Sequence, residues 1–389
     1  MSVRRHAAPF VSAGVVAALA LACSKRASAP NGGVAPSSST AVLAPHPSGS
    51  AAPLGRLSTP TAFELTASPT GATLVWAPAD RTTAALLERE LDASGALVGP
   101  VNAAVASASV TGEVADLALS WVGPRLGVAW LERSGAVARV RAAWAGASSA
   151  PFELGAAWTG PRSSRGNVVM AARGDKALVF ARGGEAACID SAQHGCFAFG
   201  FHELDASHAV VTGLPMSVPV PCTDNSAALS VVGERFHYGV CTETAGRPVT
   251  TLFSIQHDPE YARADPLLEG CTPAGTFVWH NAAWLVGDCT GGRRAARIGD
   301  DPAEFLDLHG IRLECQSGRM RIRAPSLDLA LDEPRSGLAP LLPPDVARTG
   351  ARAVWAGRAL VVATSFAEQL RLTRRTCNGD RLETATLLP

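Results

Sequence analysis

The sequence predicts an all-β fold built from a repeated unit, and three observations support this prediction. Short apolar and β-branched runs recur between Gly, Pro, Asp and Ser from about residue 58 onward. No long window in that region has the sustained periodicity and caps of an amphipathic helix. Two sequence motifs also recur along the chain. Self-similarity at a period of about 50 residues is typical of repeat architectures.

The first motif predicts a β-hairpin over residues 121–130, with the sequence Trp-Val-Gly-Pro-Arg-Leu-Gly-Val-Ala-Trp. Gly and Pro form the turn between two apolar strands. Residues 355–363 repeat its Trp, Gly, Leu, Val and Ala in register, and looser copies start at Trp279 and Val231. Because tryptophan recurs with the hairpin, we expect these side chains to pack in the core rather than to stack on sugars.

The second motif, Glu-Leu-Asp-Ala-Ser, occurs at residues 90–94 and 203–207. With both motifs as guides, the chain divides into seven predicted units, each with room for four strands. The units cover residues 63–104, 115–157, 168–220, 227–268, 276–308, 311–342 and 351–388. The unit over 311–342 has the weakest strand pattern.

Four strands per unit at this period predict a β-propeller of seven four-stranded blades over residues 59–389. A single small sheet cannot bury both of its faces, so such sheets stack around an axis. The second strand of most units is an uninterrupted apolar run, as in residues 360–363, which indicates burial on both faces. Merging the fifth and sixth units would give six blades, and this alternative stays open.

The start of the chain predicts export. Arg4 and Arg5 precede an apolar run over residues 7–22, the pattern of a signal peptide too short for a lasting membrane span. The sequence Leu-Ala-Leu-Ala-Cys that ends at Cys23 resembles the lipobox of bacterial lipoproteins, which implies cleavage after residue 22 and lipidation of Cys23. An ordinary secretory signal with an incidental cysteine is the alternative. By the same resemblance, Ser24 favours the outer membrane within the cell envelope.

Residues 23–58 are rich in Ala, Pro, Ser and Gly and predict a flexible linker. The region that follows resembles the propeller domains of secreted bacterial lipoproteins. It lacks the Gly-His and Trp-Asp pairs of WD repeats and the Asp-box of sialidases. The resemblance therefore implies a fold and carries no function with it.

Eight cysteines remain once Cys23 is set aside, and an even number in an exported chain predicts disulfides. Similar spacing relates Cys222–Cys241 to Cys271–Cys289, so we expect each pair to join the two ends of one hairpin. Cys188–Cys196 would close a long loop, and Cys315–Cys377 would link the last two units. The sequence has no Cys-x-x-Cys pair and no histidines at matching spacing, so it does not indicate a zinc site.

Three of these disulfides would stiffen one face of the propeller, where the hairpin ends meet. Loops held by a stiff scaffold commonly carry function, so this stapled face is the predicted binding surface. Its polar residues are Asp190, His194, Asp224, Asn225, Glu243, Asp288, Arg293 and Arg294.

Catalytic motifs do not emerge from the sequence. It lacks a nucleophile elbow, a phosphate loop, a calcium loop and a His-Glu-x-x-His motif, and His202, Glu203 and His208 have the wrong spacing for a metal. No cofactor is expected. Asp190 with His194, or Asp224 with Asp288, could supply acid–base chemistry, but hydrogen bonding within loops is the simpler interpretation.

The charge is balanced, with 34 basic and 34 acidic residues, which argues against a nucleic-acid partner. The sequence therefore favours a monomeric, non-enzymatic domain that is tethered to the membrane by its lipid and binds a protein or glycan partner. A polysaccharide hydrolase or lyase with carboxylates at the channel mouth is the alternative. The partner is not specified by the sequence.

Overall fold

A computed structural model describes residues 60–387 of the chain, apart from internal gaps. The gaps cover residues 79–85, 106–109, 135–136, 147–150, 157–167, 183–196, 206–208, 211–215, 219–227, 233–234, 245–246, 256–262, 281, 299–303, 333–337, 344, 347–349 and 367–368. The predicted signal peptide, the predicted lipidation site Cys23 and the predicted linker lie outside the described residues. In the ranges that the structure covers, no helix has the length and apolar character to cross a membrane.

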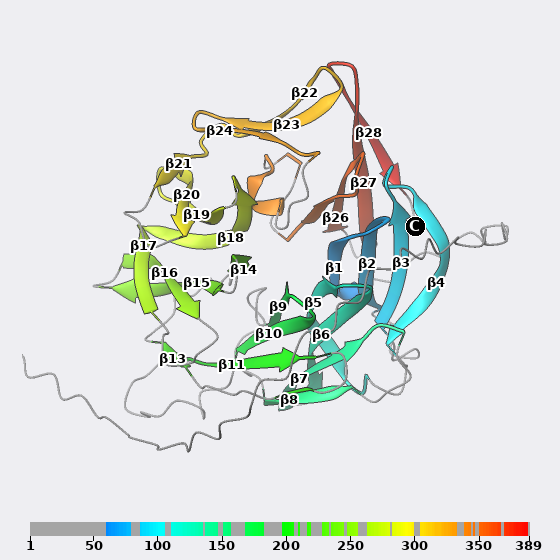
Figure 1. Cartoon of the computed structure of the whole chain (residues 1–389), viewed down its shortest axis with the longest axis vertical. Helices are drawn as coiled ribbons and strands as arrows, with labels where there is room; N and C mark the ends of the chain where they lie inside the picture. Colours follow the sequence, from blue (N-terminus) through cyan, green and yellow to red (C-terminus); the bar gives the residue numbers. More distant parts are fainter. Residues whose placement is uncertain are drawn as a thin grey trace, which may run out of the picture. The chain divides into compact units, whose positions relative to one another are not determined.

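The described residues form antiparallel sheets, which we name A to G in chain order (Figure 1). Sheet A contains β1 (Pro60–Ser68), β2 (Gly71–Pro78), β3 (Leu86–Asp92) and β4 (Leu97–Val105). Sheet B contains β5 (Glu113–Val122), β6 (Arg125–Ser134), β7 (Val137–Trp144) and β8 (Phe152–Ala156). Sheet C contains β9 (Val168–Arg173), β10 (Lys176–Arg182), β11 (Phe197–Leu204), β12 (Ala209–Val210) and β13 (Met216–Val218).

The second half of the chain continues the pattern. Sheet D contains β14 (Ala228–Val232), β15 (Arg235–Thr244), β16 (Arg247–Ile255) and β17 (Arg263–Glu269). Sheet E contains β18 (Cys271–Trp279), β19 (Ala282–Cys289), β20 (Gly292–Ile298) and β21 (Phe305–Asp307). Sheet F contains β22 (Arg312–Gln316), β23 (Arg319–Ala324) and β24 (Leu327–Ala330). After the 3-10 helix η4 (Ala339–Leu341), sheet G contains β25 (Arg352–Trp355), β26 (Leu360–Phe366), β27 (Gln369–Asn378) and β28 (Arg381–Leu387).

The prediction of an all-β fold with four-stranded units is confirmed in its main outline. Sheets A, B, D, E and G have four strands each, paired in chain order. Sheet F has three strands, and in sheet C both β12 and β13 pair with β11. The fifth predicted unit starts too late, because β18 begins at Cys271 rather than at Thr276.

Second strands are buried on both faces, as their apolar runs predict. In β2 every residue from Gly71 to Ala77 is buried, and β6 is buried from Leu126 to Glu132. Trp76 and Trp130 lie at matching positions in these strands, opposite Phe63 and Leu117 of the first strands. Both indoles are almost fully buried, so these tryptophans are core residues as expected.

The repeated tryptophans at the hairpin ends also contact the core. Trp121, Trp279 and Trp355 are partly buried and pack against buried clusters at the edges of their sheets. Trp144 and Trp284 are buried, and Trp158 lies outside the described residues. Within the described part of the chain, therefore, the tryptophans serve packing.

All described residues belong to one compact unit, Gly49–Pro389, in which successive sheets share buried clusters. The cluster between sheets A and B includes Val75, Leu117, Val128 and Trp130. The cluster between sheets B and C includes Leu131, Val140, Val179 and Leu204. Sheets E, F and G share a cluster that includes Trp284, Ile322, Leu329, Leu341 and Val362. Strand β14 of sheet D lies beside both β9 and β18, which continues the series.

The last sheet packs against the first. One buried cluster unites Leu65, Trp76 and Leu91 of sheet A with Val354, Val361 and Leu372 of sheet G. First strands also lie side by side, because β1 contacts β5 and β25, and β5 contacts β9. Helix η4 contacts β18 and β25, in the position where sheet F supplies no first strand among the described residues.

The Glu-Leu-Asp-Ala-Ser motif explains part of this packing. In its first copy, Arg358 of sheet G donates its backbone N–H to the carbonyl of Ala93 at 2.8 Å. In the second copy, Trp144 of sheet B donates its indole N–H to the carbonyl of Asp205 at 3.1 Å. The motif leucines, Leu91 and Leu204, are buried in the same two interfaces. The copy in sheet C thus docks on the preceding sheet, B, and the copy in sheet A docks on the last sheet, G.

Sheet F is attached to sheet G by a covalent and a hydrogen-bonded contact. Cys315 of β22 forms a disulfide with Cys377 of β27, with 5.7 Å between their Cα atoms. The backbone N–H of Ser317 donates to Asp380 Oδ1 at 2.6 Å, and that of Gly318 donates to the carbonyl of Gly379 at 3.0 Å. The predicted link between the last two units is confirmed.

Gly275 of β18 marks the point where η4 packs on sheet E. Its φ is 154°, and a Cβ there would lie 2.1 Å from Pro340 Cγ of η4. We expect Gly275→Ala to lower the free energy of unfolding by about 2 kcal/mol through overpacking. Urea denaturation checks this. Gly291→Ala, whose Cβ would meet nothing within 4 Å, is the control and should change stability by less than about 0.5 kcal/mol. Equal losses in both variants would mean that η4 does not pack on Gly275.

Candidate functional site

The predicted binding face lies only partly within the described residues. Four of its residues fall outside them: Asp190, His194, Asp224 and Asn225. Glu243 lies on β15. The cysteines Cys188, Cys196 and Cys222 also lie outside the described residues, while Cys241 is on β15, so these two pairings stay predictions.

The Cys271–Cys289 disulfide is present and joins the two ends of one hairpin, as predicted. Cys271 is the first residue of β18 and Cys289 the last of β19, and their Cα atoms lie directly opposite, 4.0 Å apart. The next pair along the ladder is Thr272 and Asp288. The disulfide therefore fixes the position of Asp288 at the end of the hairpin.

Asp288 forms a two-point ion pair with Arg293, which lies opposite it on β20. Arg293 Nε donates to Asp288 Oδ1 at 2.7 Å and Nη2 to Oδ2 at 3.3 Å. Arg293 Nη1 also donates to the carbonyl of Pro340 in η4 at 2.6 Å. Arg294 is the next residue along β20, so its exposed side chain points to the other face of the sheet. The structure thus joins two of the predicted residues in an ion pair that anchors η4.

A group of charges that the sequence analysis missed lies on neighbouring first strands. Glu64 of β1 and Arg352 of β25 form an ion pair with side chains only 19% and 21% exposed. Asp116 of β5 is buried and close enough for its charge to act on both. We call Glu64, Asp116 and Arg352 the first-strand charge cluster; it holds two carboxylates and one guanidinium.

Each carboxylate of this cluster has partners within the chain. Glu64 Oε1 accepts the backbone N–H of Leu65 at 3.1 Å, and Oε2 accepts from Arg352 Nε. Asp116 Oδ1 accepts the N–H of Leu117 at 3.0 Å, and Oδ2 accepts that of Val168 at 3.2 Å. Because Val168 begins sheet C, Asp116 ties sheet B to the next sheet while Glu64 ties sheet A to the last.

Burial dominates the electrostatics of the cluster. Burial raises the pKa of Glu64 above its usual range, although the Arg352 charge opposes this shift. For Arg352, burial lowers the pKa, but the charges of Glu64 and Asp116 outweigh it and the pKa is raised. The guanidinium therefore stays charged, paired with Glu64 and within range of the Asp116 charge.

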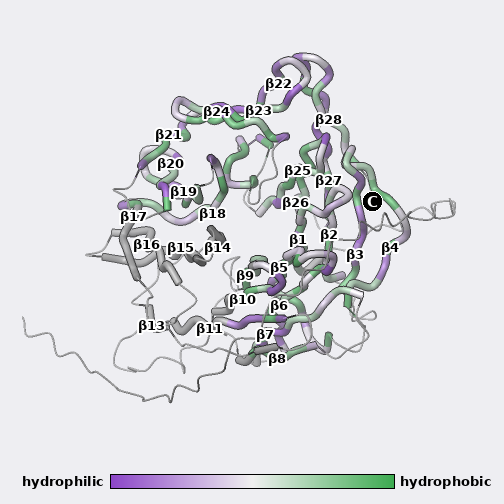
Figure 2. Tube along the Cα trace, viewed as in Figure 1, coloured by the Kyte–Doolittle hydropathy of each residue, from purple (hydrophilic) through white to green (hydrophobic). Residues whose placement is uncertain are grey.

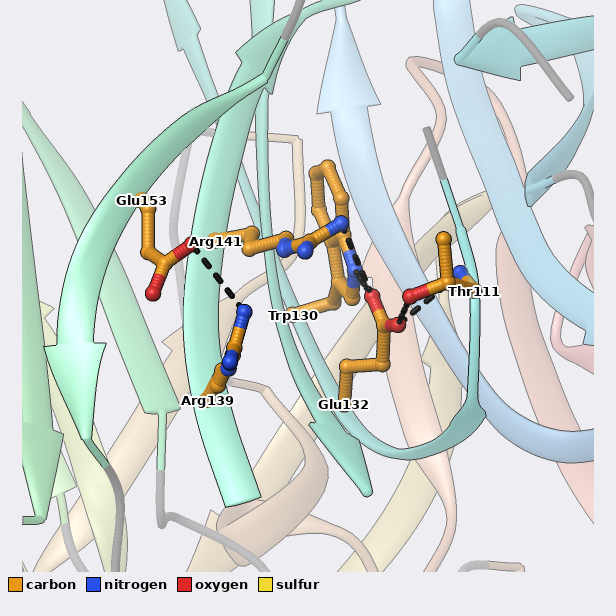
Figure 3. Close-up of polar contacts among 6 residues, drawn as sticks. All are labelled: Thr111, Trp130, Glu132, Arg139, Arg141 and Glu153. Carbon is orange, nitrogen blue, oxygen red and sulfur yellow. Dashed lines mark hydrogen bonds and ion pairs between the residues drawn. The ribbon is translucent and has the colours of Figure 1, made fainter. Parts of the chain in front are cut away.

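A second buried carboxylate, Glu132 of β6, joins sheet B to the segment after β4 (Figure 3). Its Oε1 accepts the backbone N–H of Thr111 at 2.8 Å and the Thr111 hydroxyl. Its Oε2 accepts the indole N–H of Trp130 at 3.3 Å and lies 3.5 Å from Arg141 Nη1. Glu132 is 4% exposed, so these partners compensate for the loss of water.

A signal for these sites was present in the sequence. Glu64, Asp116 and Arg352 interrupt or begin apolar strands, and Glu132 ends an apolar run. A charged residue in a strand buried on both faces requires a partner. The predicted binding face was drawn from charged residues in loops and at hairpin ends, so these strand residues were not predicted.

The described carboxylates do not assemble a metal site. Within the ranges that the structure covers, no three His, Cys, Asp or Glu side chains are placed to hold a metal ion. His202 is a buried histidine on β11, opposite Val179 of β10. No described group hydrogen-bonds to its Nδ1.

Burial lowers the pKa of His202 below its usual 6.5, because the charged imidazolium is poorly solvated there. The unfolded chain binds a proton near pH 6.5, whereas the folded chain does so only at lower pH. Stability should therefore fall as the pH drops below about 6.5. Urea denaturation at about pH 7.5 and about pH 5.5 should show a smaller pH-dependent loss for His202→Gln than for the wild type. The exposed His309, changed to Gln, is the control; an unchanged pH dependence in His202→Gln would contradict the assignment.

Comparisons with known proteins yield fold-level likenesses only. No family model matches this chain, and no curated protein matches it. Its structure is similar to the β-propeller domain of the Trilobed protease from Pyrococcus furiosus (TM-score 0.41, 8% identity, 80% of this chain and 92% of that chain). It is also similar to a subtype N10 neuraminidase-like protein of A/little yellow-shouldered bat/Guatemala/060/2010 (TM-score 0.41, 9% identity, 83% and 92% covered).

A third similar structure comes from a study of two prolyl endopeptidases, with a TM-score of 0.38 and 11% identity. The match covers 80% of this chain and 45% of that chain, so this chain spans less than half of that protein's length. The neighbours thus include hydrolases and neuraminidase-like proteins of very low identity. They assign no activity to this chain.

Proposed function

We propose that the chain is an exported, lipid-anchored β-propeller that binds a protein or glycan partner and has no catalytic activity. In the proposed propeller, the sheets follow one another in a ring of seven units, and sheet G meets sheet A. The sixth unit consists of sheet F and η4. The shared clusters between successive sheets and the docking of both Glu-Leu-Asp-Ala-Ser copies support this arrangement.

One observation carries the non-enzymatic role. The mostly buried carboxylate of Glu64, the buried ones of Asp116 and Glu132, and the exposed one of Asp288 are all bonded to groups of the chain itself. A general acid or base must instead reach a proton of the substrate. Because these carboxylates join strands and sheets to one another, their role is structural.

A hydrolase is the second candidate because of Glu64. Its pKa is raised by burial, and a second carboxylate, Asp116, lies on the neighbouring strand. In glycoside hydrolysis, the catalytic acid is typically a carboxyl group with a raised pKa that lies beside a second, ionised carboxylate. Here the carboxyl group with the raised pKa, that of Glu64, is paired with Arg352, and this pairing opposes its use as a catalytic acid.

Release of reducing ends from polygalacturonate and from neutral xylan distinguishes the two candidates. We expect the full chain to release none above the buffer rate. The hydrolase would be supported instead by release that Glu64→Gln abolishes while the melting temperature stays unchanged. Asp116→Asn gives a second test of the carboxylate pair.

The anchor is tested separately, because its residues lie outside the described ones. Cys23→Ser should prevent incorporation of labelled palmitate and release the protein from the membrane fraction. The two disulfides accord with export, since disulfides persist in oxidising compartments. Equal membrane association of the wild type and the Cys23→Ser variant would contradict the lipid anchor.

A further inference from the structure

The two faces of sheet F differ sharply in chemistry. Met320 and Ile322 of β23 and Leu329 of β24 face the buried cluster shared with sheets E and G. The alternate residues point the other way, and purple and green alternate along β23 in Figure 2. The outward face therefore carries the polar residues of the sheet.

The central strand of this face presents only arginines. The sequence Arg-Met-Arg-Ile-Arg of β23 places Arg319, Arg321 and Arg323 on the outward face, and Arg312 of β22 lies opposite Arg323. Alternate residues of a strand repeat at about 7 Å, so the three guanidinium groups follow a line along the strand. Arg312 and Arg319 are 65% and 66% exposed, whereas Arg321 and Arg323 are 24% and 32% exposed. Arg323 Nη2 also donates to Gln316 Oε1 at 2.6 Å. We call these four residues the arginine row.

Acidic neighbours pair with the arginine row and offset all but one of its positive charges. Arg321 Nε donates to Asp328 Oδ1 at 2.7 Å, Arg319 Nε lies 3.4 Å from Asp332 Oδ2, and Glu314 pairs with Arg312. Four arginines against the three carboxylates Glu314, Asp328 and Asp332 leave one positive charge. A guanidinium has five N–H donors, so a contact through Nε leaves donors for a second acceptor.

We propose that the outward face of sheet F binds an acidic polysaccharide along the arginine row. Arginine recognises carboxylates through two parallel hydrogen bonds, and a linear glycan acid repeats its carboxylates along an extended chain. The interspersed Glu314 and Asp328 supply acceptors for sugar hydroxyls. This inference rests on the proposed binding role and names the partner class and the surface.

Other polyanions fit the face less well. Nucleic acid binding without base pairing relies on aromatic side chains that stack on bases, and the outward positions of β22, β23 and β24 hold no aromatic residue. An extended acidic peptide would add to a strand edge through its backbone rather than lie across a face. Both are outcomes of the test.

Binding of the full chain to polygalacturonate, dextran, oligo-dT and polyglutamate, measured by biolayer interferometry at low and physiological salt, tests the proposal. We expect affinity for polygalacturonate above all three comparators. The double variant R312Q/R319Q should lose about tenfold or more of this affinity. The matched control is R139Q/R297Q, which removes two half-exposed arginines paired with Glu153 and Glu304 on sheets B and E. The control should change the affinity less than about twofold.

Three outcomes would overturn the inference. These are absent polygalacturonate binding, equal losses in both double variants, and equal or tighter binding of dextran, oligo-dT or polyglutamate. The reducing-end assay is independent of all three. A chain that releases reducing ends while binding through the arginine row would refute the proposed non-enzymatic function alone. A chain without activity or polygalacturonate affinity would refute this inference alone.

Discussion

Trp130→Ala is expected to lower the free energy of unfolding by about 4 kcal/mol. The indole is buried between sheets A and B, with no measurable exposure, and its N–H donates to Glu132. The substitution leaves a large cavity and removes one partner of a buried carboxylate. Urea denaturation measures the loss, provided that the free energy of unfolding falls with urea concentration at the same slope in both proteins.

Trp130→Phe separates the two contributions. Phenylalanine retains most of the ring but cannot donate to Glu132, so we expect a loss of about 1–2 kcal/mol. If the alanine variant lost less than the phenylalanine variant, Trp130 would not lie in the interface between the two sheets.

Arg352→Leu is expected to cost about 3 kcal/mol near neutral pH. The substitution leaves Glu64 mostly buried and without its counter-charge. Protonation of Glu64 relieves this cost. Because the pKa of Glu64 is already raised and rises further without Arg352, the loss should shrink as the pH falls toward about 4.

The double variant Glu64→Gln/Arg352→Leu completes the cycle. It should be more stable than Arg352→Leu alone at neutral pH, because no unpaired charge remains. Additive losses would show that Glu64 and Arg352 do not interact. They would also contradict the contact between β1 and β25 that this ion pair makes.

The sequence predicts the strands well where burial determines them. The apolar runs of β6 and β26 must be covered on both faces, and these strands contain the second strand of the predicted 121–130 hairpin and the predicted run 360–363. The Cys271–Cys289 pairing follows equally from the antiparallel register. Both features depend on local chain geometry, which the sequence contains.

The sequence is less informative where proline intervenes. Pro273 and the following Gly275 suggest a turn, but the register shift between them forms a bulge and β18 continues through it. In the sixth unit, Pro340 and Pro343 lack the N–H groups that a strand would pair, and the segment forms η4 instead. Sheet F therefore has three strands.

The candidate site depends on contacts between distant segments. Glu64 and Arg352 meet only because the first and last sheets pack together, and no local pattern contains that contact. By contrast, Asp288 and Arg293 of the predicted binding face are close in sequence and lie opposite each other in one ladder. Long-range pairing of charges is thus the part that sequence alone does not determine.

Cross-linking of the first sheet to the last tests the central claim most directly. A Cβ at Gly357, in the hairpin between β25 and β26, would lie 3.3 Å from the Cβ of Ala93, close to the separation in a disulfide. The claim predicts that A93C/G357C forms an intramolecular disulfide, detected by peptide mass spectrometry without reduction, while the native pairs Cys271–Cys289 and Cys315–Cys377 persist. The φ of Gly357 is 110°, so the melting temperature of the variant is measured as well. Free thiols at both positions in a variant that keeps the wild-type melting temperature, or only intermolecular cross-links, would show that sheets A and G do not meet.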